Sequence, residues 1–322
     1  MARILVTGGA GFIGSSLIGA LLQSNENHNI IAYDNLSRGK LENISNWRSR
    51  PNFNFIEGDM LDDRSLEKVV NNCTIVFHLA ASSDVAIGEK NTKIDFEQNV
   101  VSTYNLLEAM RKSQECKRVI FASTSAIYGE AHKIPISENY SPLRPISLYG
   151  SSKLACESLI SGYCHMFNIA GTIARLANIT GSTSQQGVIY DFISKLLSDP
   201  NHLDMLGNGE QNKSYLHISD CVKAMVTLFE NPEKEMPAIF NVGSDDKITV
   251  SGIADILIQE LDLRNVERNY IDNHNGRGWT GDIKEFLLDS SKIKNLGWNP
   301  KYTSKDAVIQ TVRDFLKTID LK

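Results

Sequence analysis

Short apolar runs alternate with helical patterns through the first half of the chain. The apolar runs are typical of strands buried on both faces, and between them apolar positions recur every three or four residues, as in amphipathic helices. The predicted strands span 3–7, 30–33, 53–57, 75–79, 118–122 and 171–176, and the predicted helices span 11–23, 63–71, 96–112 and 147–167. This alternation predicts a parallel sheet covered by helices, with ligands bound at the carboxyl ends of its strands.

The second half of the chain is less regular. Its pattern predicts strands at 203–206, 215–218, 238–242 and near 286–288, and helices at 220–229, 250–261 and near 305–316. We therefore expect an α/β fold in which residues 1–176 form a doubly wound parallel sheet and residues 177–322 mainly form a smaller lobe facing the sheet edge. The strand at 238–242 is expected to return to the main sheet.

Glycines cluster where the first predicted strand meets the first predicted helix. Residues 4–14 read ILVTGGAGFIG, which fits both G-x-G-x-x-G and G-x-x-G-x-x-G ending at Gly14. The second strand ends in Asp34, 34 − 14 = 20 residues further on. Such glycines let the backbone approach a pyrophosphate at a helix N-terminus, and an acidic residue at this distance binds ribose hydroxyls. A glycine-rich turn without a ligand is the alternative, and Asp34 favours the dinucleotide.

Composition and charge narrow the classes of function. The net charge of −5 and the absence of a basic run argue against nucleic-acid binding. No apolar stretch approaches the ~20 residues of a membrane span, and we expect no secretory signal, because the first apolar run is predicted to be a strand. Five scattered cysteines without a C-x-x-C pair indicate reduced thiols, so we expect a cytoplasmic protein. The seven histidines show no metal-ligand spacing, and no metal is expected.

Tyr149 and Lys153 are the strongest candidates for acid–base chemistry. They are four residues apart, and on a helix they share a face. A phenol is a poor base at neutral pH, but a neighbouring ammonium favours the phenolate. A solvated helix face explains an isolated Tyr-x-x-x-Lys pair equally well. This pair, however, lies one predicted helix after a strand that ends in Ser123-Thr124-Ser125, inside a dinucleotide-binding pattern.

Taken together, these motifs resemble a known family. The quoted segments TGGAGFIG (7–14), YDNLS (33–37), GD (58–59), HLAA (78–81), YGE (128–130) and YGSSK (149–153) are similar to the extended short-chain dehydrogenases, and more narrowly to the NAD-dependent epimerase/dehydratase group that acts on nucleotide sugars. NVGS (241–244) and LGWNP (296–300) are similar to its C-terminal part, so the resemblance covers nearly the whole chain. It implies a Rossmann fold, an NAD cofactor, a nucleotide-sugar substrate and a C-terminal substrate-binding lobe.

The resemblance also implies a role for individual residues. The catalytic group would be Thr124, which orients the reacting oxygen, Tyr149, which is the acid and base, and Lys153, which holds the nicotinamide ribose. The cofactor would contact Gly8, Gly11, Phe12, Ile13, Gly14, Asp34, Asn35, Ser37, Arg38, Asp59, Met60, Leu79, Ala80, Ala81, Asn99, Ser123, Tyr149 and Lys153. The substrate would contact Thr124, Asn178, Val188, Lys213 and Arg277.

Two features of the cofactor and the reaction follow from the motifs. Arg38 could contact a 2′-phosphate, but Asp34 would repel it, so NAD is favoured over NADP. The 4,6-dehydratases carry Asp-Glu after the catalytic Ser/Thr, where this chain has Ser125 and Ala126, which offer no titratable group. We therefore expect a nucleotide-sugar 4-epimerase, with UDP-glucose and UDP-galactose as the favoured substrates.

Some alternatives stay open at this point. The enzyme could be another epimerase, a decarboxylase or a dehydratase of the group, and a non-catalytic NAD-binding sensor would belong to a different class. The family often has Arg-Asp where Lys213-Ser214 stand, and an aromatic residue where Thr180 stands. Both departures concern the substrate rather than the cofactor. Arg277 is the better candidate for the diphosphate, because a guanidinium fits phosphate geometry. The resemblance also implies a homodimer built from helices 96–112 and 147–167, which the pattern cannot separate from ordinary core packing.

Overall fold

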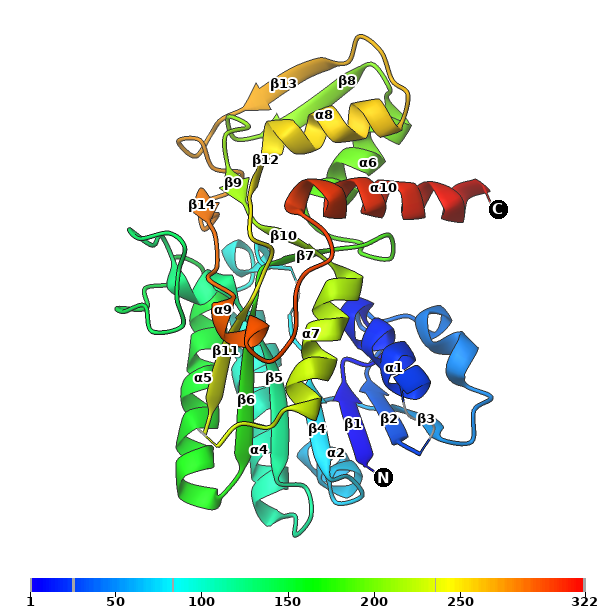
Figure 1. Cartoon of the computed structure of the whole chain (residues 1–322), viewed down its shortest axis with the longest axis vertical. Coiled ribbons are helices and arrows are strands. Elements are labelled where there is room, and N and C mark those ends of the chain that lie inside the picture. Colours follow the sequence, from blue (N-terminus) through cyan, green and yellow to red (C-terminus); the bar gives the residue numbers. More distant parts are fainter. Residues whose placement is uncertain (1, 25–26, 83, 235, 321–322) are drawn as a thin grey trace.

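A seven-stranded parallel sheet forms the body of the computed structural model, which describes residues 2–24, 27–82, 84–234 and 236–320 (Figure 1). The strand order is β11-β6-β5-β4-β1-β2-β3, and every pairing is parallel. The bounds are β1 (Arg3–Thr7), β2 (Asn29–Asp34), β3 (Phe53–Glu57), β4 (Ile75–His78), β5 (Arg118–Thr124), β6 (Ala170–Leu176) and β11 (Ala238–Val242). The predicted doubly wound sheet is confirmed, and the strand at 238–242 pairs with β6 in it.

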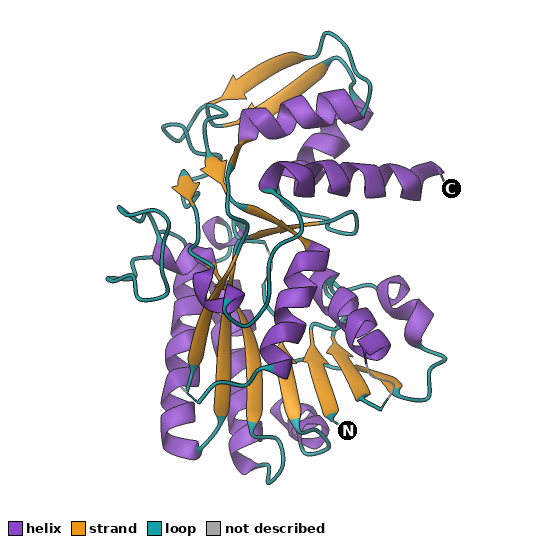
Figure 2. Cartoon of the chain, in the orientation of Figure 1, coloured by secondary structure: helices purple, strands orange, loops and turns teal. Residues whose placement is uncertain are grey.

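Helices cover both faces of this sheet, because the strand residues point alternately to each side (Figure 2). Ile4 and Val6 pack in one apolar cluster with α1 (Phe12–Ser24) and α7 (Ile218–Glu230). Leu5, between them, packs in a second cluster on the other face, with α2 (Asp63–Val70), α4 (Ser102–Lys112) and α5 (Leu148–Phe167). The near-continuous apolar strands are therefore explained by burial on two sides.

The predicted helix at 96–112 is helical along its whole length, but its first part is not an α-helix. The chain there runs through α3 (Thr92–Asp95) into a single π-helical stretch, η3 (Phe96–Val101), before α4 begins. Such a wide turn is common at functional sites, and it holds Asn99 in the interior. Three short 3₁₀ helices complete this part of the fold: η1 (Leu41–Trp47), η2 (Ile87–Glu89) and η4 (Ser125–Tyr128).

A smaller lobe lies over the carboxyl ends of the strands (Figure 1). Its core joins α6 (Val188–Ser198), α8 (Val250–Glu260) and α10 (Ser304–Asp320). The short strands around them pair as β7 (Asn178–Thr180) with β10 (Tyr215–His217), β8 (His202–Leu206) with β13 (Glu267–Ile271), and β9 (Asn212–Lys213) with both β12 (Ile248–Thr249) and β14 (Glu285–Phe286); α9 (Ser291–Lys294) precedes α10. The pattern of apolar residues did not predict α6, β13 or the short strands β7, β9 and β12. The proposed division at residue 176 stays a prediction.

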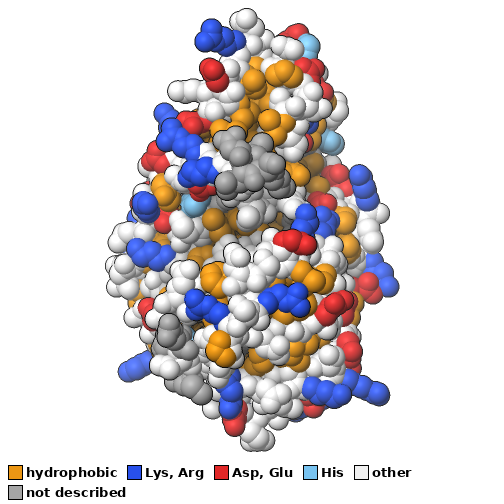
Figure 3. All heavy atoms as spheres, turned by 90° about the vertical axis from the view of Figure 1, so that its right-hand side faces the viewer, with side chains coloured by type: hydrophobic (Ala, Val, Ile, Leu, Met, Phe, Trp, Pro, Cys, Tyr) orange, Lys and Arg blue, Asp and Glu red, His pale blue; other side chains and the backbone are white. Residues whose placement is uncertain are grey.

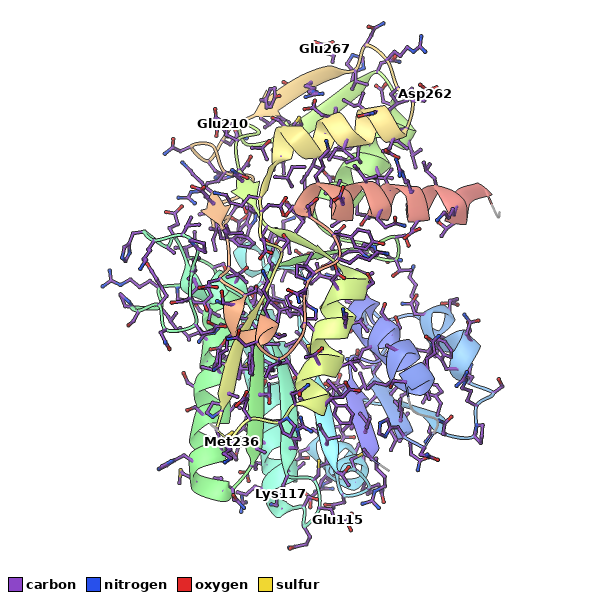
Figure 4. The ribbon with its side chains drawn as sticks, in the orientation of Figure 1. Glu115, Lys117, Glu210, Met236, Asp262 and Glu267 are labelled. Atoms are coloured by element: carbon purple, nitrogen blue, oxygen red, sulfur yellow. The ribbon has the colours of Figure 1, made fainter. Side chains whose placement is uncertain are left out.

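The two ends of the molecule are easily told apart. Glu115 and Lys117, which precede β5, lie at the amino-terminal edge of the sheet, whereas Glu210, Asp262 and Glu267 lie in the smaller lobe at the opposite end (Figure 4). On the side shown in Figure 3, acidic and basic side chains are interspersed. Within the described ranges, no helix combines the length and the apolar character that crossing a membrane requires. All five cysteines are free and buried.

Candidate active site

Two connected cavities lie where the smaller lobe meets the strand ends. The larger, of about 860 Å³, is bounded by the ends of β5 and β6, the start of α5, and segments of the smaller lobe. The smaller, of about 300 Å³, lies over the glycine-rich turn. They share part of their lining: Phe12, Ile13, Arg38, Leu79, Ala81, Ser184, Gln185 and Gln186. Both volumes fall in the range of small-molecule sites, and the position matches the ligand crevice of doubly wound sheets.

The glycine-rich turn is packed too tightly for side chains. A Cβ at Gly14 would stand 2.1 Å from the Gly8 carbonyl oxygen, and one at Gly8 would stand 2.9 Å from the Ala80 backbone nitrogen. Gly8 also has a φ of +68°, which favours glycine. The turn therefore brings bare backbone to the floor of the smaller cavity at the start of α1, which is the arrangement that binds a pyrophosphate.

Asp34 lies at the end of β2 with its carboxylate turned to the same cavity. Its two oxygens accept hydrogen bonds from the Ala10 and Leu36 backbone nitrogens, at 3.0 and 2.9 Å. Burial raises the pKa of this carboxyl, and the two backbone bonds act against that rise. Because the group is held in place beside the glycine-rich turn, it can accept hydrogen bonds from ribose hydroxyls and would repel an added phosphate.

Helix α5 carries the acid–base pair. It begins where the Ser147 hydroxyl accepts the Gly150 N–H at 3.1 Å, so that Tyr149 and Lys153 follow on the first turns. The Lys153 ammonium donates to the Ala122 carbonyl at 2.9 Å and lies 4.6 Å from the centre of the Phe121 ring and 6.0 Å from that of Tyr149. Burial lowers the pKa of Lys153 to about 8, which leaves it mostly protonated at neutral pH.

The Tyr149 phenol faces the larger cavity together with Thr124. Burial raises its pKa, as does the charge of Asp95, while a hydrogen bond with the Thr124 hydroxyl lowers it. The protein alone therefore keeps the phenol neutral, in the form of an acid. It would serve as a base when further positive charge enters the cavity, which an oxidised nicotinamide supplies. The residues present thus fit a nicotinamide dinucleotide spanning the two cavities.

Buried polar chains fix the strand ends around this pair. The Thr7 hydroxyl is 2.9 Å from His78 Nδ1, and His78 Nε2 is 3.0 Å from the Thr103 hydroxyl, which donates to the Asn99 carbonyl. Burial lowers the pKa of His78 to about 3, so the ring is neutral. The Asn99 side chain accepts from the Ser82 backbone and donates to the Ser152 hydroxyl, both at 2.8 Å. Strands β1 and β4 are thereby tied to α5 next to Lys153.

A second buried network holds the end of β5. Glu157 accepts hydrogen bonds from the Ser123 hydroxyl and from the Arg175 guanidinium. Glu157 and Arg175 form an almost fully buried salt bridge at 2.7 Å. Arg175 also donates to the Tyr128 hydroxyl, which in turn donates to Asn241 on β11 at 2.7 Å. Sequence reasoning missed Glu157, Arg175 and Asn241 as site supports, although a charged pair among apolar strand and helix positions is a signal.

The substrate side of the cavity is built from segments far apart in the chain. Lys213 on β9 forms an ion pair with Asp282, and both line the larger cavity. Asn178 forms a side-chain hydrogen bond with Tyr215. The Arg277 guanidinium instead pairs with Glu130 at 2.6 Å and donates to the Asp282 carbonyl, and Arg277 does not line either cavity.

Most of the predicted site residues come together around the two cavities. All predicted cofactor contacts line them except Asp59 and Asn99, and all predicted substrate contacts do except Arg277. Asp59 lies next to the cavity wall, where it accepts a hydrogen bond from Asn35 at 3.0 Å. The roles of all these residues stay predictions. Sequence reasoning missed several lining residues: Asp84, Ser147, Tyr190, Gln211, Tyr215, Trp279 and Asp282. Of these, Trp279 and Asp282 belong to the same glycine-containing segment as Arg277, which was predicted from the sequence to contact the substrate.

Comparison with known proteins agrees with this geometry. The family described as GDP-mannose 4,6-dehydratase matches residues 5–311. A protein of Methanocaldococcus jannaschii, provisionally named a UDP-glucose 4-epimerase, is 33% identical over 96% of this chain and 97% of its own length. The dTDP-D-glucose 4,6-dehydratase of Homo sapiens is 31% identical over 96% of this chain and 89% of its own length.

Solved structures are similar over the same extent. A UDP-galactose 4-epimerase structure superposes with a TM-score of 0.87 and 35% identity, covering 98% of this chain and 99% of the other. Further similar structures are NAD complexes of 4-epimerases and of a 4,6-dehydratase. Both reaction types therefore occur among proteins that share this fold along their whole length.

Proposed function

The chain belongs to the NAD-dependent epimerase/dehydratase family of extended short-chain dehydrogenases, and we propose that within it this protein is a nucleotide-sugar 4-epimerase. The observation that carries the proposal is the triad of Thr124, Tyr149 and Lys153 at one wall of the larger cavity, with no carboxylate in the two positions that follow Thr124. A sensor that only binds nucleotide does not need this acid–base group.

NAD is the proposed cofactor. Its pyrophosphate would lie on the glycine-rich turn, and the adenosine ribose would bind Asp34. Arg38 lies 3.6 Å from Asp84 and lines both cavities. When bound, NAD⁺ would supply reversible hydride transfer at the sugar C4. The other steps are carried out by the side chains of the protein.

Tyr149 moves the proton in the proposed mechanism. Its phenolate takes the proton from the sugar 4-hydroxyl as C4 is oxidised, and the Thr124 hydroxyl donates a hydrogen bond to the same sugar oxygen. The 4-keto sugar then rotates in the cavity so that the opposite face of C4 is presented. On reduction, the Tyr149 hydroxyl returns its proton to the ketone oxygen. Lys153 stays bonded to the Ala122 carbonyl and keeps a positive charge beside the phenolate throughout.

The residues after Thr124 favour epimerisation over dehydration. Loss of water from the sugar needs an acid and a base near C5 and C6, and Ser125 and Ala126, which line the cavity, provide neither. The acidic residues in the lining of the larger cavity each lie beside a cation: Asp282 is paired with Lys213, Asp191 with Lys195, and Asp84 lies beside Arg38. The dehydratase remains the second candidate, because relatives of that class are about as similar as the epimerases.

UDP-glucose and UDP-galactose are the proposed substrates. The nucleoside would lie between α6 and the segment at 278–283, where Val188, Tyr190 and Trp279 line the cavity. The diphosphate would be gripped by Lys213 and Arg277, with Asn178 as a polar contact. Similar structures include a UDP-galactose 4-epimerase, a UDP-glucose 4-epimerase with UDP-glucose, and a UDP-glucuronic acid 4-epimerase with UDP-glucuronic acid, so the sugar is the feature to test first.

The test is incubation of the purified protein with a panel of UDP-, dTDP-, GDP- and CDP-sugars, followed by chromatography and mass spectrometry. We expect UDP-glucose and UDP-galactose to interconvert with unchanged mass. A stable product lighter by one water would identify a dehydratase, and one lighter by carbon dioxide a decarboxylase. No change with any sugar, in protein that binds NAD, would favour the sensor.

We also propose that two copies associate through α4 and α5. These helices lie side by side, and Phe96, Tyr104 and Met166 on or next to them are 58%, 48% and 71% exposed. Exposed large apolar groups on neighbouring helices are typical of an interface. Sedimentation of Tyr104→Glu should show a shift from dimer to monomer, and a wild-type monomer would refute the dimer.

A further inference from the structure

Asp95 is a buried carboxyl group that the proposed reaction does not use. It ends α3, directly before the π-helical stretch that holds Asn99, and only 1% of its surface is exposed. It lies in neither cavity lining. Within the described part of the chain, neither of its oxygens accepts a hydrogen bond of ordinary distance and angle, although the Ser82 side chain interacts with the carboxyl group. A buried carboxyl without well-formed hydrogen bonds is costly, so its retention calls for a reason.

The surroundings of Asp95 place it beside the first turn of α5, the helix that carries the acid–base pair. Gly88 leaves room for it, because a Cβ there would stand 3.0 Å from Asp95 Oδ2 and 3.2 Å from the Leu148 Cβ, at the start of α5. Segments α3 and η3 both pack against α5. The carboxyl group is thus enclosed between η2 and the first turn of the helix that carries Tyr149 and Lys153.

We propose that Asp95 is a charge-balancing positioning residue, whose carboxylate holds Lys153 in its protonated form and opposes ionisation of Tyr149. The inference rests on the proposed function, in which these two residues act together. It adds a third charge to the pair. With the Asp95 carboxylate and the Lys153 ammonium, the buried group is neutral while Tyr149 keeps its proton. Positive charge that enters the cavity then favours the phenolate form of Tyr149.

Other charged groups around the pair do not replace Asp95. Ser82 and Asp84, in the loop after β4, lie near Asp95, as does Lys153 on α5. Burial raises the pKa of Asp95, and so does the charge of Asp84, whereas the Ser82 side chain and the charge of Lys153 lower that pKa. Glu89 on η2 accepts a hydrogen bond from the Thr280 backbone and is exposed. On the segment that contains Asp95, Lys93 forms a solvent-exposed ion pair with Glu97.

Two acidic groups also face Lys153 from α5 itself. Glu157 is neutralised by Arg175, and burial raises the pKa of the Cys156 thiol, which keeps it uncharged. His78, on β4, is neutral. Among the described residues, Asp95 is therefore the acidic group near Lys153 that has no other cationic partner. Its negative charge raises the pKa of both Lys153 and Tyr149.

The test is a carbon-13 NMR titration of the lysine ε-carbons in the cofactor-free protein, with the Lys153 signal assigned by its loss in Lys153→Arg. We expect a midpoint near pH 8 in the wild type. Asp95→Asn, which keeps the shape and removes the charge, should lower it by on the order of one pH unit. Asp95→Ala should lower it similarly, so that a folding defect in one variant does not decide the outcome.

Glu97→Gln is the matched control, because it removes an acidic group two residues away that pairs with Lys93 in solvent. It should leave the Lys153 midpoint in place. In the active enzyme, Asp95→Asn should also move the acid limb of the kcat–pH profile to lower pH, since Tyr149 would ionise more easily. A Lys153 midpoint unchanged in both Asp95 variants overturns the inference. Because this readout needs neither substrate nor cofactor, it is independent of whether the protein is an epimerase.

Discussion

The two ends of the site are assembled in different ways. The proposed cofactor end lies at the ends of strands β4, β1 and β2, which are adjacent in the sheet, and it presents backbone groups and a carboxylate that backbone N–H groups hold. The substrate end brings together β9, the start of α6 and the segment at 277–282, joined by the Lys213–Asp282 and Arg277–Glu130 ion pairs. The first is set by local geometry and the second by long-range pairing. Substrate preference can therefore change without disturbing the dinucleotide cradle.

The largest expected effect is on turnover and comes from Tyr149, which lies between the cofactor end and the substrate end. Tyr149→Phe removes the proposed acid and base and keeps the ring, so turnover should fall by at least ~100-fold, the lower range for loss of general acid–base catalysis. NAD⁺ affinity, measured by calorimetry, should change little, because phenylalanine keeps the ring and the proposed pyrophosphate and ribose contacts lie in the smaller cavity. Turnover near the wild-type value would mean that another group moves the proton.

The substrate end should respond to the loss of either cation. Arg277→Ala and Lys213→Met each remove a proposed charge-assisted contact worth roughly 1.5–3 kcal/mol. Each should raise the KM for the nucleotide sugar about 10- to 100-fold, at about 1.4 kcal/mol per decade. The affinity for NAD should be spared. Steady-state kinetics and calorimetry on the same protein preparation separate the two quantities.

Glu130→Gln distinguishes a grip on substrate from a structural role of Arg277. In the structure this guanidinium is held by Glu130 and must leave it to reach the cavity. If Arg277 binds the diphosphate, Glu130→Gln should leave the KM unchanged or lower it. Equal increases in Arg277→Ala and Glu130→Gln would instead show that the ion pair only fastens the loop.

The same contrast explains what the sequence could predict. The glycines, Asp34 and the alternating strands predicted the sheet and the cofactor end, because each depends on residues close together in the chain. Helix α6 and strand β13 were missed because their burial depends on distant partners: α6 packs against α8, and β13 pairs with β8. The π-helical stretch at Asn99 has the same apolar spacing as an ordinary helix. The pairing of Arg277 with Glu130 joins positions that no local pattern connects.

The cofactor end should respond to added bulk. Gly14→Ala places a Cβ 2.1 Å from the Gly8 carbonyl oxygen, so the turn must shift at a cost of about 1–3 kcal/mol. We expect NAD⁺ affinity to fall about 5- to 100-fold by calorimetry. Gly162→Ala on α5 is the control, because nothing lies within 4 Å of its Cβ. It should bind NAD⁺ normally and gain a little thermal stability. Equal binding by both variants would contradict the proposed cradle.

The smallest expected effect concerns the choice between NAD and NADP. Asp34 is held 3.0 Å from the Ala10 nitrogen beside the ribose position, where its charge would repel a 2′-phosphate. Asp34→Ala should narrow the preference for NAD⁺ over NADP⁺, measured by thermal shift and calorimetry, by about tenfold, or about 1.4 kcal/mol. Glu57→Gln is the matched control, because Glu57 on β3 pairs in register with Asp34 on β2 but is exposed and outside both cavities.

If Glu57→Gln narrowed the preference for NAD⁺ over NADP⁺ as much as Asp34→Ala does, general surface charge would be the cause. If the wild type favoured NADP⁺, the cofactor assignment would be wrong, although the sugar chemistry at Tyr149 would still be open to its own test. The cofactor end and the substrate end can thus fail separately, which is expected when one is built by local geometry and the other by distant ion pairs.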